Sequence, residues 1–376
     1  MKPIYYLLHR DPPVETSGYP SAIPTGFQCF QTPKSRRDGR SVTSVVGRCH
    51  FNPAFFALAL LLYAGAATAQ TTIRVRSVDN LQTLINNATA GTTFLVEAGV
   101  YGGTINVNKR VTLIGTGYFL GLGGQATGAS SEIGTLTFQA GGEFSTVMGF
   151  VIGNCNVQTS NVLVSRNAIG TVSISKNSGA DPILGIVLKQ NYISGIVYVE
   201  RAGCTLTNNL TNGLSINSNS SGEIKNNVIY GAIGYSVDGF SNSGQVTIKN
   251  NIIRGFSSYP NLNSIEYNYI YKTSNPAIGN LSGTNRFSSS DPPANLFAGF
   301  PTNSANLNLD ARFQLPANSP TKGAGEGGTD CGAFGGDEPY VLSGLPAGPI
   351  VYELSVPSQV PSTSTLNVRV KARVQN

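Results

Sequence analysis

Tryptophan is absent from the sequence, and methionine occurs only at Met1 and Met148. Charged residues make up 12% of the 376 residues, about half of the roughly 25% that is usual. Glycine, with 44 residues, and proline, with 20, are abundant instead. Because Lys, Glu and Met favour helices whereas Gly, Pro, Asn and Ser favour turns, this composition predicts an all-β protein of short strands joined by turns.

Histidine is nearly absent as well, and both copies, His9 and His50, lie towards the N-terminus. If residues 1–69 are removed, no histidine remains, which excludes a Ser-His-Asp triad, a histidine-ligated metal and a histidine base. Seven of the 25 Lys and Arg residues and three of the 19 Asp and Glu residues lie in this stretch. The rest therefore carries 18 basic and 16 acidic residues, a balance that does not indicate binding to nucleic acid.

A short apolar run, residues 55–63, leads into small residues that end in Ala67-Thr68-Ala69. This pattern fits a secretory signal with an A-x-A cleavage site, and the run is shorter than the roughly 20 residues that span a bilayer. We therefore predict that residues 51–69 are a signal peptide. The mature protein would then be secreted or held at the cell surface, with no membrane span. Residues 1–50 are interpreted as a disordered extension or as sequence upstream of the true start.

Three cysteines remain after such a cleavage: Cys155, Cys204 and Cys331. Three thiols cannot all pair within one chain, and their wide spacing is not a disulfide framework. Cys204 falls at an inward position of the repeat described next, which predicts a buried free thiol.

Six segments repeat around an asparagine, at steps of 24, 18, 18, 24 and 17 residues. The asparagines are Asn167, Asn191, Asn209, Asn227, Asn251 and Asn268. Three residues earlier stand only apolar residues, namely Val164, Leu188, Leu206, Ile224, Ile248 and Ile265. Two residues later five of six are apolar, Thr211 being the exception. With flanking columns taken as mostly polar, the pattern is strand alternation interrupted by a bend at the asparagine.

Asparagine suits a bend because it tolerates left-handed backbone geometry, and stacked asparagines can bond to one another. A third strand follows in each coil, with inward pairs at Val172 and Ile174, Val197 and Val199, Leu214 and Ile216, and Ile233 and Tyr235. Three strands per coil predict a parallel β-helix, a solenoid whose core is buried by stacking coils about 4.8 Å apart.

Several stretches resemble the pectate-lyase-like right-handed β-helix proteins of bacterial secreted type. They are residues 77–88, 91–101 and 111–115 at the start, and 310–315, 319–320 and 330–336 at the end. The resemblance implies an N-terminal cap with a helix in residues 70–102 and a β-helix in residues 103–337. It constrains activity weakly, because the fold hosts lyases, glycosidases, esterases, epimerases, adhesins and inactive relatives.

Residues 338–376 are predicted to be a linker followed by a C-terminal hairpin, because residues 350–356 and 366–374 both have strand character. Two interpretations of the hairpin stay open: a cap that protects a sheet edge, or an attachment or secretion signal.

The outward side of the third strand is the first candidate site, for binding polysaccharide. Tyr198 can stack on a sugar ring, and Glu200, Arg201, Asn217 and Asp238 can bond hydroxyls or a uronate carboxylate. The alternative is an ordinary solvated sheet face.

The second candidate site consists of Lys225, Lys249 and Arg254. The two lysines are expected to be outward neighbours about 5 Å apart, and a lowered lysine pKa would suit a base that removes the proton next to a uronate carboxyl. A surface charge ladder is the alternative. Calcium needs six to eight oxygen ligands, and only Glu200 and Asp238 are expected to approach one another. No metal site and no cofactor are therefore predicted. Bound Ca²⁺ is expected only if the protein is a lyase.

The function predicted from the sequence is a non-catalytic module that contacts extracellular or cell-surface polysaccharide. The alternative is a polysaccharide lyase that cleaves uronate polymers of pectate or alginate type by β-elimination.

Overall fold

The computed structural model describes residues 71–121, 126–175, 181–216, 220–231, 237–238, 245–256, 264–272, 283–302, 306–357 and 365–375. The chain divides into two units, Met1–Ala69 and Gln70–Asn376, and every described residue belongs to the second. The predicted extension and signal peptide lie outside the described residues, as do Ile233, Tyr235 and Asn217. For Asp238 the backbone is described but the side chain is not.

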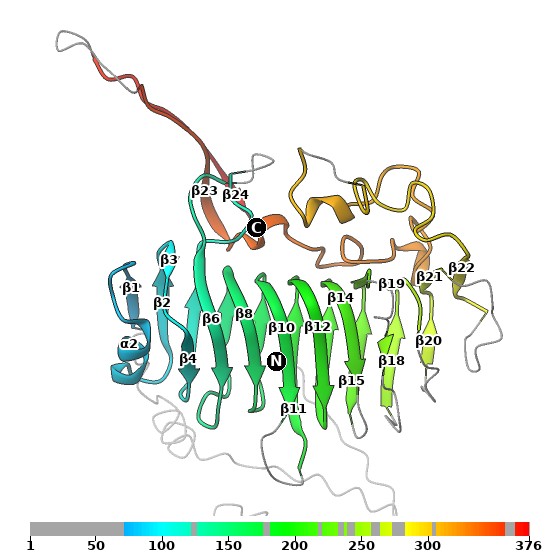
Figure 1. The fold of residues 1–376 in the computed structure, drawn as a ribbon, viewed down its shortest axis with the longest axis horizontal. Coiled ribbons are helices and arrows are strands. Elements are labelled where there is room, and N and C mark those ends of the chain that lie inside the picture. The colour runs from blue at the N-terminus through cyan, green and yellow to red at the C-terminus, as the bar shows by residue number, and fades with distance from the viewer. Residues whose placement is uncertain are drawn as a thin grey trace, which may run out of the picture. The chain divides into compact units, whose positions relative to one another are not determined.

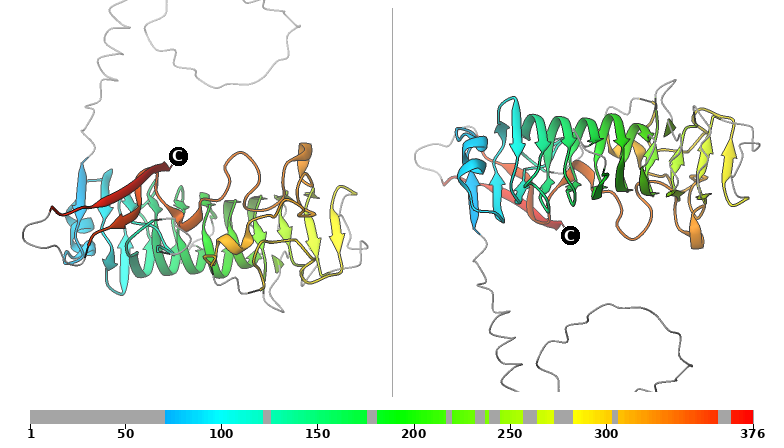
Figure 2. Two further views of the ribbon diagram at one scale, coloured as in Figure 1. Left: turned by 90° about the horizontal axis from the view of Figure 1, so that it is seen from above. Right: turned by 90° about the horizontal axis from the view of Figure 1, so that it is seen from below.

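Two long parallel sheets form the body of the second unit (Figures 1 and 2). The described strands of sheet A are, in spatial order, β1 (Thr72–Val75), β2 (Thr92–Val96), β5 (Val111–Ile114), β7 (Thr146–Met148), β9 (Leu163–Ser165), β11 (Ile183–Lys189), β13 (Ala202–Thr207), β15 (Ser221–Lys225), β18 (Gln245–Lys249) and β20 (Ser264–Glu266). The described strands of sheet B are β22 (Arg286–Ser288), β21 (Tyr269–Tyr271), β19 (Ile252–Ile253), β16 (Val228–Ile229), β14 (Leu210–Ile216), β12 (Tyr192–Glu200), β10 (Ala168–Ser175), β8 (Phe150–Val157), β6 (Ser131–Phe138) and β3 (Gly99–Val100), with β4 (Thr104–Val107) beside β6 and β17 (Val237–Asp238) beside β14.

From β5 to β16 the chain alternates between the sheets, so each coil gives one strand to sheet A and the next to sheet B. The fold is a parallel β-helix with the right-handed winding that parallel crossovers adopt. The predicted fold class is therefore confirmed. It differs in one respect: the expected second and third strands of a coil run on as a single bent strand, as in β10 and β12, with a register shift between Ile169 and Val172.

The predicted capping helix is α2, Leu81–Asn87. It begins where the Asn80 side chain accepts a hydrogen bond from the Thr83 amide at 2.9 Å, an N-cap interaction. Leu81 and Ile85 are buried in the same core as the strands, so the helix packs on the first coils.

The inner core confirms the predicted register. Val164, Leu188, Leu206, Ile224, Ile248 and Ile265 are at most 2% exposed and are consecutive strand partners. Cys204 and Cys155 lie in the same core as free thiols, and Cys331 is buried in a second cluster. Burial raises the pKa of each thiol to about 12, so all three stay protonated and unreactive at neutral pH.

The predicted asparagine ladder is present at the bend between the sheets. Each amide nitrogen bonds the amide oxygen of the next coil at 2.9–3.2 Å, in the order Asn167, Asn191, Asn209, Asn227, Asn251, Asn268 and Asn285. The expected left-handed geometry belongs to the preceding residue instead, at Arg166, Gln190, Asn208, Asn226, Asn250 and Tyr267. The ladder residues are thus chosen for buried hydrogen bonding, and the turn itself accepts several residue types.

A second core lies outside the coil. The column directly after the ladder was expected to be polar, and this is wrong: it reads Ala168, Tyr192, Leu210, Val228, Ile252 and Tyr269. Residues of the chain end, including Phe313, Cys331, Ala333 and Tyr340, pack on this column. Because another segment covers the column, its outward positions are apolar.

Residues 326–345, here called the closing segment, run along the ladder bend (Figure 1). Glu326 N–H donates to the Asn250 side chain, Asn208 donates to the carbonyls of Ala333 and Gly335, and Arg166 donates to that of Leu345. The segment therefore crosses successive coils in reverse order and ties them together.

The predicted C-terminal hairpin is present as β23 (Gly348–Ser355) paired antiparallel with β24 (Arg369–Gln375). It forms a sheet of its own, tied to the body where Thr127 N–H donates to the Val351 carbonyl at 3.1 Å. In the described residues it does not extend sheet A or sheet B by strand pairing. No helix of the described chain has the length and apolar character needed to cross a membrane.

Candidate functional site

The outer face of sheet B divides at a row of glycines. At Gly153, Gly170 and Gly195 an added Cβ would lie 2.3–2.5 Å from the carbonyl oxygen of the glycine one coil earlier. Only glycine permits this approach, and the strand bends here. Before the bend the chain end covers the column from Val151 to Tyr269, whereas Glu132 one coil earlier is exposed. After the bend the outer face carries short polar side chains.

Eight of these polar side chains form a regular array that we call the outer grid. In strand order its rows are Thr104 and Asn106, Thr135 and Thr137, Asn154 and Asn156, and Thr171 and Ser173. The residue between the two members of each row points inward and is at most 3% exposed: Ile105, Leu136, Cys155 and Val172. Rows on neighbouring parallel strands stand about 4.8 Å apart, and the two members of a row about 6.6 Å apart.

Tyr198 continues one column of the grid. Its strand partners are Ser173 on one side and Ser215 on the other, and Ser215 is in turn paired with Asp238 of β17. The Tyr198 side chain is 43% exposed. The structure therefore places Tyr198 beside the grid and aligns the backbone of Asp238 with it.

The other residues of the first candidate site lie at the strand end. Glu200 is exposed opposite Ser175, and Arg201 follows it with a left-handed backbone, φ 51°. Asn217 lies outside the described residues. Sequence reasoning named the Tyr198 side of this face but missed the grid, although the alternation Thr135-Leu-Thr137 and Asn154-Cys-Asn156 was there to find it.

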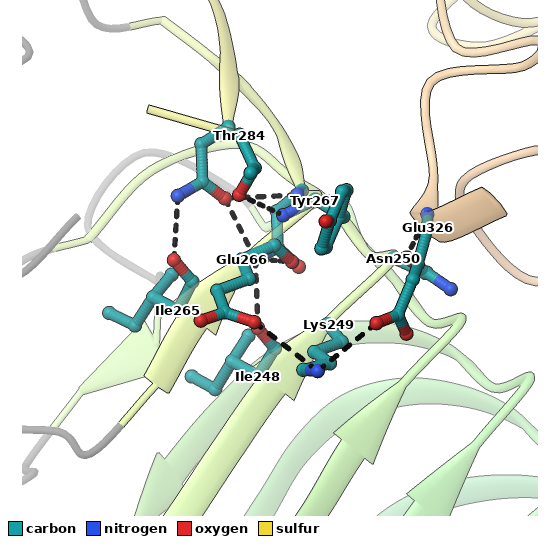
Figure 3. Close-up of polar contacts among 10 residues, drawn as sticks. Ile248, Lys249, Asn250, Ile265, Glu266, Tyr267, Thr284 and Glu326 are labelled. Carbon is teal, nitrogen blue, oxygen red and sulfur yellow. Dashed lines mark hydrogen bonds and ion pairs between the residues drawn. The ribbon is translucent and has the colours of Figure 1, made fainter. Parts of the chain in front are cut away.

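The second candidate site lies on sheet A, at the end of the strands. Lys225 and Lys249 are strand partners, as expected from the repeat. Figure 3 shows that the Lys249 ammonium lies between two carboxylates, 3.2 Å from Glu266 Oε2 and 3.4 Å from Glu326 Oε1. The hydrogen bond to Glu266 raises the pKa of Lys249. This direction is opposite to the lowered pKa that would suit a base, so a proton-accepting role is disfavoured for Lys249.

Arg254 lies on the other sheet, directly after β19 of sheet B. Its guanidinium bonds both oxygens of Asp291, at 2.8 and 2.6 Å, and the Gly231 carbonyl at 2.7 Å. The same contact raises the pKa of Arg254 and lowers that of Asp291. Lys249 and Arg254 thus lie on different sheets and are held by different carboxylates, so these two cations do not share one site.

A groove of about 670 Å³ lies between the bend, the closing segment and the hairpin. Its lining includes Arg166, Lys189, Glu338 and Arg373. Lys189 pairs with Glu338 at 2.6 Å, so part of the charge is neutralised within the groove. Sequence reasoning could not find this groove, because its walls come from chain segments about 150 residues apart.

A buried polar cluster fixes the base of the closing segment. Asp310 accepts hydrogen bonds from the Ser343 amide at 2.6 Å and from the Tyr340 hydroxyl at 3.4 Å, and Tyr340 also bonds Tyr118. Burial raises the pKa of Asp310. Since Asp310, Tyr118 and Tyr340 are all at most 5% exposed, we regard this cluster as structural.

No group of three or more His, Cys, Asp or Glu side chains suited to a metal ion occurs in the described ranges. No protein-family model and no curated protein sequence matches the chain. Among solved structures, a crystal structure of the pectate lyase Pel9A is similar, with a TM-score of 0.38 and 14% sequence identity. The match covers 72% of this chain and 98% of that one. The class of fold, a right-handed parallel β-helix, is defined by the strand pairing described above.

Proposed function

We propose that this protein binds extracellular polysaccharide without cleaving it, through the face of sheet B that carries the outer grid and Tyr198. The observation that carries the proposal is the continuity of this polar surface: aligned hydroxyl and amide side chains on successive coils end at an exposed aromatic ring. Hydroxyls and amides can both donate to and accept from sugar hydroxyls, and a tyrosine ring can pack on a sugar ring.

The same proposal accounts for the remaining residues of the first candidate site. Glu200 and Arg201 flank Tyr198 at the strand end and can bond hydroxyls at the border of the surface. Access to extracellular polysaccharide requires export, which we attribute to the signal predicted in residues 51–69.

A polysaccharide lyase receives less support. Such an enzyme needs a base, a group that neutralises the uronate carboxylate and an acid, all converging within a few ångströms. Lys249 is instead ion-paired with a raised pKa, and Arg254 is fully engaged by Asp291 and a carbonyl. These side chains stabilise the fold where a lyase would need them free.

Binding is tested by affinity electrophoresis in gels that contain individual polysaccharides. Tyr198→Ala is expected to weaken binding about fivefold to tenfold, since aromatic stacking contributes about 1 kcal/mol. The matched control is Phe144→Ala, which removes an aromatic ring that is 66% exposed just before β7 of sheet A. An equal loss in both variants, or no retardation in any polysaccharide, would refute the proposal.

Catalysis is tested separately by incubating the protein with uronate polymers and calcium and following the absorbance of unsaturated products. We expect no turnover. Turnover that Lys225→Ala or Lys249→Ala abolishes, with an unchanged melting temperature, would replace the binding proposal with the lyase.

A further inference from the structure

The outer grid is uncharged. Its eight positions hold four threonines, three asparagines and one serine, on four consecutive coils. Thr104 and Asn154 are exposed, Thr137 is buried, and the remaining members are partly buried. Asn156 donates a hydrogen bond to Thr137 at 3.3 Å. Side chains of similar, short length on a regular sheet give a surface without large projections or deep hollows.

The grid is also two-dimensional. Its spacing is about 4.8 Å along the stack of coils and about 6.6 Å along each strand. A single flexible chain would find no groove walls here and would lose its conformational freedom for contacts on one side only. A ligand with a rigid, repeating surface has no such freedom to lose. Each coil of the protein can then contact the same chemical groups of the ligand, so the contacts add up across the grid.

From this geometry we infer that the ligand is an ordered surface of a neutral, β-1,4-linked polysaccharide, as in cellulose or chitin, with its chains along the stack of coils. This inference rests on the proposed function and specifies its ligand. An extended β-1,4-linked chain advances by roughly one coil rise per sugar, so successive rings meet successive rows. Neighbouring parallel chains can then meet the two columns. The lack of charge on the grid selects against uronate polymers, whose carboxylates would be desolvated without a partner.

Tyr198 marks one end of the ordered area. Tyr198 is the strand partner of Ser173 in the next coil. Its ring is larger than the short side chains of the grid. It is placed to pack against the border of the polysaccharide face, so its loss weakens binding without removing the grid.

The inference is tested by co-sedimentation with insoluble cellulose and chitin, in parallel with gel retardation by soluble polygalacturonate and alginate. Asn154→Lys places a long charged side chain at an exposed position in the third row of the grid. It is expected to weaken binding to the insoluble polymer at least tenfold. Thr112→Lys makes a similar change on the outer face of sheet A and is expected to have no effect. Equal melting temperatures would show that both variants fold, and Thr104→Lys repeats the test at a second exposed grid position.

The outcomes separate the inference from the proposed function. If the protein binds an insoluble neutral polymer, and this binding is insensitive to salt and is lost in Asn154→Lys, the inference and the proposed function are both supported. Binding only to the soluble acidic polymers, weakened by Tyr198→Ala but not by Asn154→Lys, overturns the inference and leaves the proposed function. Sedimentation with no polymer, and retardation by none, overturns both. Grid-dependent inhibition of ice recrystallisation without polysaccharide binding would likewise overturn both, and would identify ordered water as the ligand.

Discussion

The two outer faces of this β-helix are displayed by the same coils but carry opposite chemistry. On sheet A, Lys189 and Lys249 form ion pairs with Glu338 and Glu326, both in the closing segment. On sheet B, the outer grid holds only neutral side chains, and the closing segment packs before the glycine bend. These ion pairs attach the closing segment to sheet A, whereas the outer grid carries no charge.

This comparison bears on the charged residues that the sequence offers as catalytic candidates. A lysine column on a solenoid attracts attention because catalysis needs charge, yet here two nearby carboxylates fix the Lys249 charge. One of these carboxylates, Glu326, lies 77 residues from Lys249 in the sequence. The structure is therefore needed to show that the two are paired.

Both faces depend on one inner core, so the largest expected effect comes from breaking it. Leu206→Asp would bury an unpaired charge at a position that is 2% exposed and is expected to cost more than about 4 kcal/mol of unfolding free energy. Thr207→Asp, the next residue, adds the same charge outward between Lys189 and Lys225 and is expected to change stability by less than about 0.5 kcal/mol. Urea unfolding measures both, and equal stabilities would show that the inward and outward assignments are wrong.

The ladder that joins the two faces ranks second. Asn209→Ala would leave the Asn191 backbone N–H and one Asn191 amide hydrogen without an acceptor in a fully buried position. Each unsatisfied group costs about 1–3 kcal/mol, so a loss of about 3 kcal/mol is expected. Asn154→Ala removes an exposed asparagine and serves as the control. If thermal denaturation gave the two variants the same melting temperature, the ladder would not stabilise the fold.

The glycine bend concerns sheet B alone. Gly170→Ala would bring a Cβ within 2.3 Å of the Gly153 carbonyl oxygen, and the resulting displacement is expected to cost about 1–3 kcal/mol. Because Thr171 follows directly, polysaccharide binding should weaken as well, while the sheet A ion pairs stay intact. Gly103→Ala, where an added Cβ meets nothing within 4 Å, is the control for both measurements. Unchanged stability in Gly170→Ala would mean that the bend does not need glycine.

Much of the inner architecture was predictable because it repeats. The columns at Leu206 and Asn209 recur once per coil, and only stacking can bury such a pattern, so the register followed from counting. The left-handed position was misplaced by one residue because the sequence shows an asparagine preference at both places, as in Asn208-Asn209 and Asn250-Asn251. Local residue preference could not distinguish the residue with the left-handed backbone from the residue whose side chain forms the ladder hydrogen bonds.

The outer architecture was less predictable because it depends on contacts between distant segments. The column of Leu210, Val228 and Ile252 is apolar in the sequence, yet only the packing of Phe313 and Ala333 on it explains why. For the candidate site, alternation placed Tyr198 outward, and the repeat placed Glu266 beside Lys249. The other partners, Glu326 of Lys249 and Asp291 of Arg254, lie 77 and 37 residues away, outside the repeat. Pairwise ionic contacts of this kind leave no periodic signal.

The smallest expected effect tests whether the charge on sheet A acts only in attachment. Glu266→Gln removes one partner of Lys249 in a pair whose side chains are 23% and 34% exposed, and solvent limits its contribution to less than about 1 kcal/mol. Because the folded state raises the pKa of Lys249, this stabilisation is present at neutral pH and disappears as the pH rises through that raised pKa. It should also shrink in 1 M salt, where screening acts over about 3 Å. Urea unfolding at neutral and high pH, and at low and high salt, measures the difference, with Glu223→Gln on β15 as the control. A loss that is independent of pH and salt would show that Glu266 acts by packing rather than by charge, and the contrast between the two faces would then not be one of charge.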